Sequence, residues 1–171
     1  MRNILHLGVI VWLSLAFTSG CDTQDLQEEF IQAASSAPSG FTHTTPEGEV
    51  LEEDPDDWRT APIFVGSIRF RPAYPNPTSG EPVTLPFSVL QFNAFPGGLV
   101  LRGYDNTGRF VLLDEEPEAS QPGSYAFFFT PDRLSASGDL TAAQGLHRLF
   151  VFDARGELVT YGDLMVKIQA K

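Results

Sequence analysis

The side chains that could do chemistry are few, and the most reactive of them is a single thiol. Cys21 is the only cysteine among the 171 residues, so its sulfur has no partner for an intrachain disulfide and is free to be covalently modified. Beyond the N-terminal segment the only histidines are His43 and His147. The sequence contains no Gly-x-Ser-x-Gly motif, so it does not indicate a Ser-His-Asp hydrolase.

Two acidic clusters could also act chemically. The first, which could supply paired carboxylates for glycosidase-type catalysis, comprises Asp114, Glu115, Glu116 and Glu118. The second, residues 52–57, lacks the alternating oxygen ligands and central glycine of an EF-hand loop. Neighbouring acids on one loop are ordinarily solvated, and a zinc site would need more His or Cys ligands. We therefore predict a protein that is not an enzyme and has no cofactor and no metal site.

The residues that precede Cys21 follow a recognisable order. Arg2 supplies a basic start, Ile4 to Phe17 is apolar, and the small residues Thr18-Ser19-Gly20 come directly before Cys21. This order is typical of a secretory signal peptide. It resembles the lipobox of bacterial lipoproteins, which implies cleavage before Cys21, a lipid with acyl chains such as palmitate on its sulfur, and attachment to a bacterial membrane after export.

Two other interpretations of the N-terminus differ in what happens to this segment. An ordinary signal peptide would leave a free thiol near the cleavage point. A retained transmembrane helix would need about 20 apolar residues, more than the apolar stretch here provides. We expect residues 1–20 to be a lipoprotein signal peptide, with the domain held on the periplasmic or the cell-surface side of a membrane.

Negative charge is concentrated near the N-terminus of the exported part. The formal net charge is −11, and residues 21–58 contain eleven acids and no Lys or Arg, whereas residues 59–171 contain eleven acids and ten bases. No basic surface is available for phosphates, so nucleic acid is not an expected partner. Anionic headgroups would repel the acidic arm, which predicts a domain that stands off the membrane.

The arm, residues 21–60, has two parts. Leu26, Phe30, Ile31 and Ala34 follow helical spacing and predict a short helix that must dock on something, because it is too short to be stable alone. Phe41 to Asp57 has the composition of an acidic linker, after which the chain rejoins the core at Trp58. The candidate partner contacts in this arm are Leu26, Phe30, Ile31 and Trp58.

From residue 61 to 171, short apolar runs separated by Pro, Gly and Asn predict an all-β sandwich of about seven or eight antiparallel strands. We expect strands at Ile63–Phe70, Val83–Leu90, Gly98–Tyr104, Phe110–Asp114, Ser124–Thr130, Leu146–Phe152, Glu157–Tyr161 and Leu164–Ile168. Pro86 indicates a strand at an edge or a bulge. Aromatic residues on both faces of some strands imply a cover, supplied by the N-terminal helix or by another protein. Residues 131–144 are predicted to form an irregular loop that contains single helical turns.

Two turns share the pattern aromatic-Asp-x-x-Gly-charged. Asp105 with Gly108, and Asp153 with Gly156, fit hairpin turns in which Asp binds the backbone and Gly takes a positive φ. The repeat predicts structure and not catalysis.

A family resemblance appears at Tyr74-Pro75-Asn76-Pro77. This motif, the strand that follows it, the first Asp-x-x-Gly hairpin, Gly123-x-Tyr125-x-Phe127, residues 145–149 and the closing 164–168 resemble, in order, the Ig-like C-terminal sorting domain of type IX secretion cargo. They are also similar to the Ig-like domain of flagellar hook-capping proteins. The resemblance implies an Ig-like β-sandwich over residues 70–171, with the Tyr-Pro-Asn-Pro residues in a structural role.

The leading hypothesis for function is a non-catalytic, lipid-anchored envelope protein whose sandwich contacts another protein, either as an accessory subunit of a membrane-bound complex or as a surface lipoprotein. Two alternatives stay open: a type IX sorting and attachment module, and a carbohydrate-binding module. Sugar platforms usually present Trp or Tyr, whereas the aromatic residues here are mostly Phe, which favours a protein interface over a glycan or other small-molecule ligand.

Overall fold

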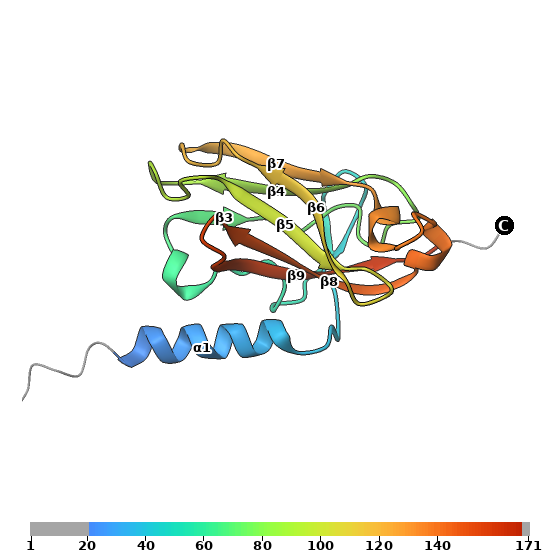
Figure 1. Cartoon of the computed structure of the whole chain (residues 1–171), viewed down its shortest axis with the longest axis horizontal. Coiled ribbons are helices and arrows are strands. Elements are labelled where there is room, and N and C mark those ends of the chain that lie inside the picture. The colour runs from blue at the N-terminus through green and yellow to red at the C-terminus, as the bar shows by residue number, and fades with distance from the viewer. Residues whose placement is uncertain (1–20, 169–171) are drawn as a thin grey trace, which may run out of the picture.

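The computed structural model describes residues 21–168, which form one helix and nine strands in antiparallel sheets (Figure 1). The N-terminal elements are α1 (Cys21–Ser35), β1 (His43–Thr44), β2 (Val50–Glu52) and the 3₁₀ turn η2 (Pro62–Phe64). The sandwich strands are β3 (Ile68–Phe70), β4 (Val83–Val89), β5 (Leu99–Tyr104), β6 (Phe110–Glu116), β7 (Gly123–Phe129), β8 (Gly145–Asp153) and β9 (Leu158–Val166), with η3 (Pro131–Leu134) and η4 (Leu140–Ala143) between β7 and β8.

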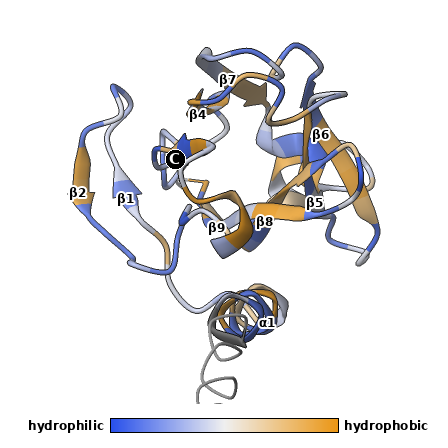
Figure 2. Ribbon diagram, turned by 90° about the vertical axis from the view of Figure 1, so that its left-hand side faces the viewer, coloured by the Kyte–Doolittle hydropathy of each residue, from blue (hydrophilic) through white to orange (hydrophobic). Residues whose placement is uncertain are grey.

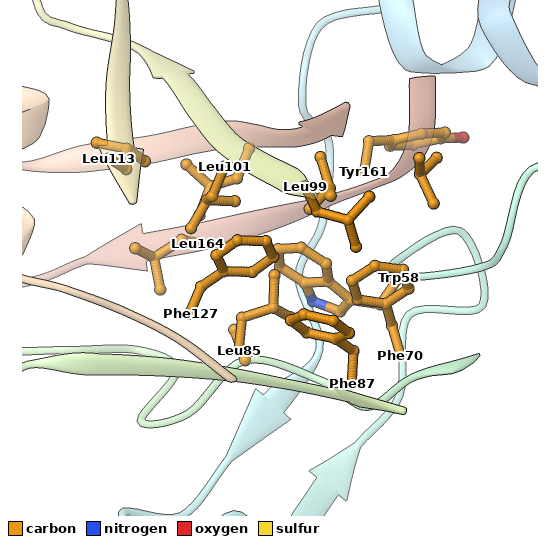
Figure 3. Close-up of a cluster of buried hydrophobic side chains, with 14 of the residues drawn as sticks. Trp58, Phe70, Leu85, Phe87, Leu99, Leu101, Leu113, Phe127, Tyr161 and Leu164 are labelled. Carbon is orange, nitrogen blue, oxygen red and sulfur yellow. The ribbon is translucent and has the colours of Figure 1, made fainter. Parts of the chain in front are cut away.

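Two sheets face each other across the core. One has the strand order β3-β4-β7 and the other β6-β5-β8-β9. Side chains that alternate along the strands fill the space between them, and those labelled in Figure 3 include Leu85, Leu101 and Phe127, all fully buried. Phe87 stacks on Phe127 with ring centroids 5.0 Å apart. The chain is therefore mostly β, with antiparallel sheets arranged as the predicted β-sandwich.

Most expected strands lie within one or two residues of their predicted bounds, but two regions differ. The start of the predicted strand Ile63–Phe70 is instead η2, because Pro62 favours the first position of a helical turn and Gly66 (φ 83°) ends it. The two predicted strands at 157–161 and 164–168 are one continuous strand, β9. Gly162 does not break it, because the Trp58 indole packs where a side chain would be.

Pro86 lies in the middle of a sheet, so the prediction of an edge or bulge was wrong. β4 is the central strand and Pro86 pairs with Ala126 of β7. The Pro86 carbonyl accepts from the Arg71 N–H, just after the end of β3. In an antiparallel pair the nitrogen and the carbonyl of one residue point to the same side, so the nitrogen of Pro86 also faces Arg71, beyond the end of β3. The missing N–H of Pro86 therefore removes no hydrogen bond between β3 and β4.

The acidic segment expected as a linker is an ordered part of the fold. β1 and β2 pair as a ribbon beside the sandwich (Figure 2), and Thr44 is bridged to Asn76. Asp57 accepts the backbone N–H groups of Thr42 (2.6 Å) and Asp163 (2.7 Å), which ties the ribbon to β9. Trp58 follows and is 4% exposed, inside the core as expected for the point where the chain rejoins it.

The predicted helix is confirmed as α1, and it docks on this chain's own sandwich. Figure 2 shows α1 under β8 and β9, with β5 and β6 beyond its cover. Phe30 and Ala34 are each 3% exposed, and the Phe30 ring lies 5.1 Å from that of Tyr161. α1 therefore covers only one side of the outer face of the four-stranded sheet.

The Tyr-Pro-Asn-Pro segment joins β3 to β4 and contacts both the β1–β2 ribbon and β9. Its two X-Pro peptide bonds are cis. The Tyr74 ring packs on Gly48 in the β1–β2 turn. Fully buried Asn76 donates through Nδ2 to the Asp163 carbonyl (2.9 Å) and accepts the Met165 N–H through Oδ1 (3.0 Å). The side chain of Asn76 thus replaces a strand partner along the edge of β9.

Candidate functional site

The outer face of the four-stranded sheet carries an uncovered aromatic cluster. It arises because β5, β6 and β8 place apolar residues on both faces, and its members are Tyr104, Phe110, Phe150 and Phe152. Tyr104 is 50% and Phe110 38% exposed, with ring centroids 4.8 Å apart. The Phe110 ring also lies 5.8 Å from those of Phe150 and Phe152. We call these four residues the outer aromatic face.

A groove of about 710 Å³ runs between the outer aromatic face and the C-terminal half of α1. Ile31 lines its helix side, and His147 and Glu157 contribute polar groups. The groove reaches from Asp105 in the β5–β6 turn to Gly156 in the β8–β9 turn. These turns lie at opposite ends of β5, which is about 17 Å long, so the groove suits an elongated ligand.

Arginines lie at the rim of this face. The Arg102 guanidinium lies 5.7 Å from the centre of the Phe110 ring and makes no ion pair within residues 21–168. Arg109 pairs with Asp105 at 2.8 Å, but its own side chain is 64% exposed. Two guanidinium groups therefore border the outer aromatic face.

The position of α1, and so one wall of the groove, depends on Arg148. Its guanidinium forms two 2.8 Å hydrogen bonds to the Asp163 carboxylate and also donates to the carbonyls of Ala33 (2.8 Å) and Ser36 (2.9 Å). These carbonyls belong to the end of α1, where backbone acceptors lack partners and positive charge is favoured. A residue of β8 thus caps a helix more than a hundred residues away.

A polar network extends from this clamp to the ribbon. The Tyr161 hydroxyl donates to Asp56 (2.7 Å) and accepts from Arg59 (3.0 Å), and burial raises the pKa of Tyr161 to about 12. Burial likewise raises the pKa of Asp57 to about 6, against the opposing effect of its two backbone hydrogen bonds, and the nearby Asp163 carboxylate adds to the rise. Burial also raises the pKa of Asp163, although Arg148 opposes this.

The four candidate partner contacts fall into two groups. Leu26 (54%) and Ile31 (45%) are exposed, and Ile31 lines the groove. Phe30 and Trp58 are buried in this chain's own core, so neither is available to a partner. The burial of Trp58 also removes it as a stacking platform for sugars. Tyr104 and Phe110 were not among the predicted contacts, although both flank the first Asp-x-x-Gly turn.

The two Asp-x-x-Gly turns have the geometry expected of hairpin turns. Asp105 accepts the Thr107 N–H (2.8 Å) and Arg109 N–H (3.0 Å), and a further hydrogen bond from the Thr107 hydroxyl lowers its pKa. Asp153 accepts the N–H groups of Arg155 and Glu157, both at 2.9 Å. Gly108 and Gly156 have φ of 80° and 86°. Neither aspartate has a carboxylate oxygen left free of intrachain hydrogen bonds.

The other residues considered for chemistry are spread over the fold. His147 lines the groove, but its Nε2 lies 2.8 Å from the Ala143 carbonyl. His43 is in β1. Asp114 and Glu116 lie in β6 and not on a loop, and Asp114 accepts the Phe128 N–H at the edge of β7. Within residues 21–168, no group of three or more His, Cys, Asp or Glu side chains is placed to hold a metal ion.

The predicted signal peptide, residues 1–20, lies outside the described residues, and Cys21 is the first residue of α1. Over the described range, 21–168, none of the helices has the length and apolar character needed to cross a membrane. No protein-family model matches this chain, and no curated protein or solved structure matches it either.

Proposed function

We propose that this chain is a non-catalytic, lipid-anchored envelope protein that binds another protein through the outer aromatic face. The observation that carries the proposal is the uncovered cluster of four aromatic side chains beside a groove of about 710 Å³ that reaches both hairpin turns. Such a cluster on an isolated domain favours association, because its burial against a partner removes apolar surface from water. The lipid would be carried by Cys21, for which the signal-peptide pattern is the support.

The shape of the groove favours a protein over a small ligand. It is open to solvent along the sheet, and its walls come from α1 and from both hairpin turns. An extended or helical segment with apolar side chains would lie along it and reach Arg102 at the rim. In this proposal the protein is an accessory subunit of a membrane-bound complex or a surface lipoprotein with a protein ligand.

The test is co-purification from native membranes in mild detergent, followed by mass spectrometry of the proteins that co-migrate. We expect the wild-type chain to bring down a partner and Tyr104→Ser/Phe110→Ser to lose it. Phe128→Ser is the matched control, because Phe128 is an even more exposed aromatic residue (60%) on the other sheet. A wild-type chain that runs alone as a monomer would contradict the proposal.

A second candidate, an Ig-like type IX sorting module, is favoured by one specific observation. The strand order β3-β4-β7 against β6-β5-β8-β9 supports an Ig-like connectivity, and the Tyr-Pro-Asn-Pro segment leads into β4, as in the family that the sequence resembles. The test is a reporter with an ordinary signal peptide fused ahead of residues 21–171, in a host with type IX secretion. A reporter that stays in the periplasm would rule out this candidate.

A further inference from the structure

One end of the sandwich concentrates exposed apolar side chains. Twelve large hydrophobic residues of the described chain are exposed, and five of them come from the first half of α1, the η2 turn and the β4–β5 loop: Leu26 (54%), Ile63 (46%), Val65 (71%), Leu90 (46%) and Phe92 (76%). We call these five residues the apolar tip. Phe92 and Val65 are the two most exposed of the twelve.

Contacts between the three elements hold the apolar tip together. The Leu90 N–H donates to the Ser67 carbonyl (2.8 Å), which joins the β4–β5 loop to the turn after η2. The Ile63 N–H donates to the Gln27 side chain on α1 (3.4 Å). Phe64 and Phe95, one from each loop, pack beneath with ring centroids 5.4 Å apart. The loops are therefore supported from inside while their neighbouring side chains point outward.

The apolar tip lies at the end of the molecule where α1 begins. Figure 1 shows the start of α1, η2 and the β4–β5 loop at the left, and the C-terminus at the opposite end. The preceding residues, with the apolar stretch Ile4–Phe17, join the chain at Cys21. A lipid attached to Cys21 would therefore lie at the same end of the molecule as the apolar tip.

The charge pattern indicates which surface this end fits. Residues 61–68 and 86–101 contain no charged residue. The first turns of α1 carry the acids Asp25, Glu28 and Glu29, whereas the acidic ribbon lies beside β9 and not at this end (Figures 1 and 2). Lys and Arg side chains draw a protein to anionic lipids, and the apolar tip has none nearby. Its side chains therefore suit a zwitterionic bilayer of no net charge, where insertion depends on the apolar area that is buried.

We propose that the apolar tip docks on the bilayer that holds the anchor, with Val65 and Phe92 inserted at the level of the headgroups. This inference rests on the proposed function, because the anchor on Cys21 brings the apolar tip to the surface. It replaces the expectation, drawn from the charge of the acidic arm, that the domain stands off the membrane. Burial of the apolar tip would add apolar contact area to the attachment made by the acyl chains. It would also fix how the outer aromatic face is presented to a partner in the same membrane.

A tryptophan scan with brominated lipid tests the docking. The full chain carrying Phe92→Trp or Phe128→Trp is purified from a bacterial host and reconstituted in phosphatidylcholine vesicles with plain or brominated acyl chains. Phe128 is the matched control because it is 60% exposed on β7, beside Thr84 at the start of β4 and so away from the loop that follows the end of β4. Trp58 gives the same buried background in both variants.

For the Phe92→Trp protein we expect a blue shift of the tryptophan emission on vesicles and a loss of its fluorescence when the acyl chains are brominated. The Phe128→Trp protein should show neither change. The intact mass of each preparation is measured in parallel. Acylated protein with no quenching of Phe92→Trp, or with equal quenching of both variants, would overturn the docking of the apolar tip and leave the anchored function intact. A chain recovered with an unmodified Cys21 would overturn the anchored function and the docking with it.

Discussion

Replacing Arg148 with alanine should detach α1 and destabilise the whole domain. The Arg148 and Asp163 side chains are 7% and 2% exposed, and they share two hydrogen bonds of 2.8 Å. Removing one partner of a buried ion pair leaves the other charge without compensation, which costs about 3–5 kcal/mol. The carbonyls of Ala33 and Ser36 lose their donor as well, so the expected loss is at the upper end of that range.

Urea unfolding of the wild-type and Arg148→Ala proteins, followed by circular dichroism, gives the difference in the free energy of unfolding. Asp163→Ala should lose a similar amount, and the double variant Arg148→Met/Asp163→Leu should lose clearly less than the sum, because it leaves no unpaired charge. Arg109→Ala is the matched control, since that arginine is 64% exposed and pairs within its own turn. A loss below about 1 kcal/mol for Arg148→Ala, as for a surface ion pair, would refute the reasoning.

Three further predictions concern β9 and its neighbours. Asn76→Ala leaves the Asp163 carbonyl and the Met165 N–H without partners. The free energy of unfolding, measured in urea, should therefore fall by about 2–4 kcal/mol. Asn106→Ala, in an exposed turn, is the control and should change it little. Gly162→Ala puts a methyl group into the Trp58 indole and should cost about 1–3 kcal/mol; unchanged thermal unfolding would mean that the indole does not pack there. The pKa of Asp57 is raised in the folded state, so the folded chain retains a proton that the unfolded chain releases, and stability should fall as the pH rises from about 4 to about 6, by up to about 3 kcal/mol. Asp57→Asn should flatten urea midpoints over that range, and an identical slope in both proteins would assign the pH dependence to other groups.

The sequence predicts the sandwich well where side chains alternate. Along the predicted strand Leu146–Phe152, Leu149 and Val151 are fully buried, whereas Phe150 lies on the outer face with Phe152. Alternation is enough here because the two faces of a strand meet different environments. The helix was predictable for a similar reason, since Phe30 and Ala34 follow its buried side.

Local composition could not reveal contacts between distant segments. Asp57 looks like one more acid in a solvated run, but it accepts two backbone N–H groups, one of them from β9. Gly162 looks like the end of a strand because its neighbour across the core, Trp58, is remote in sequence. The groove was missed for the same reason, because it forms between α1 and strands that are far from it in the sequence, and Arg148 of β8 helps to hold the two together.

The last strand, β9, is hydrogen-bonded to segments from the first half of the chain. The Trp58 N–H donates to the Tyr161 carbonyl (2.7 Å), and the Thr78 N–H donates to that of Met165 (2.9 Å). Pairing over such long sequence separations slows folding and delays it until both segments exist. A ribosome must therefore release nearly the entire polypeptide before the domain can close.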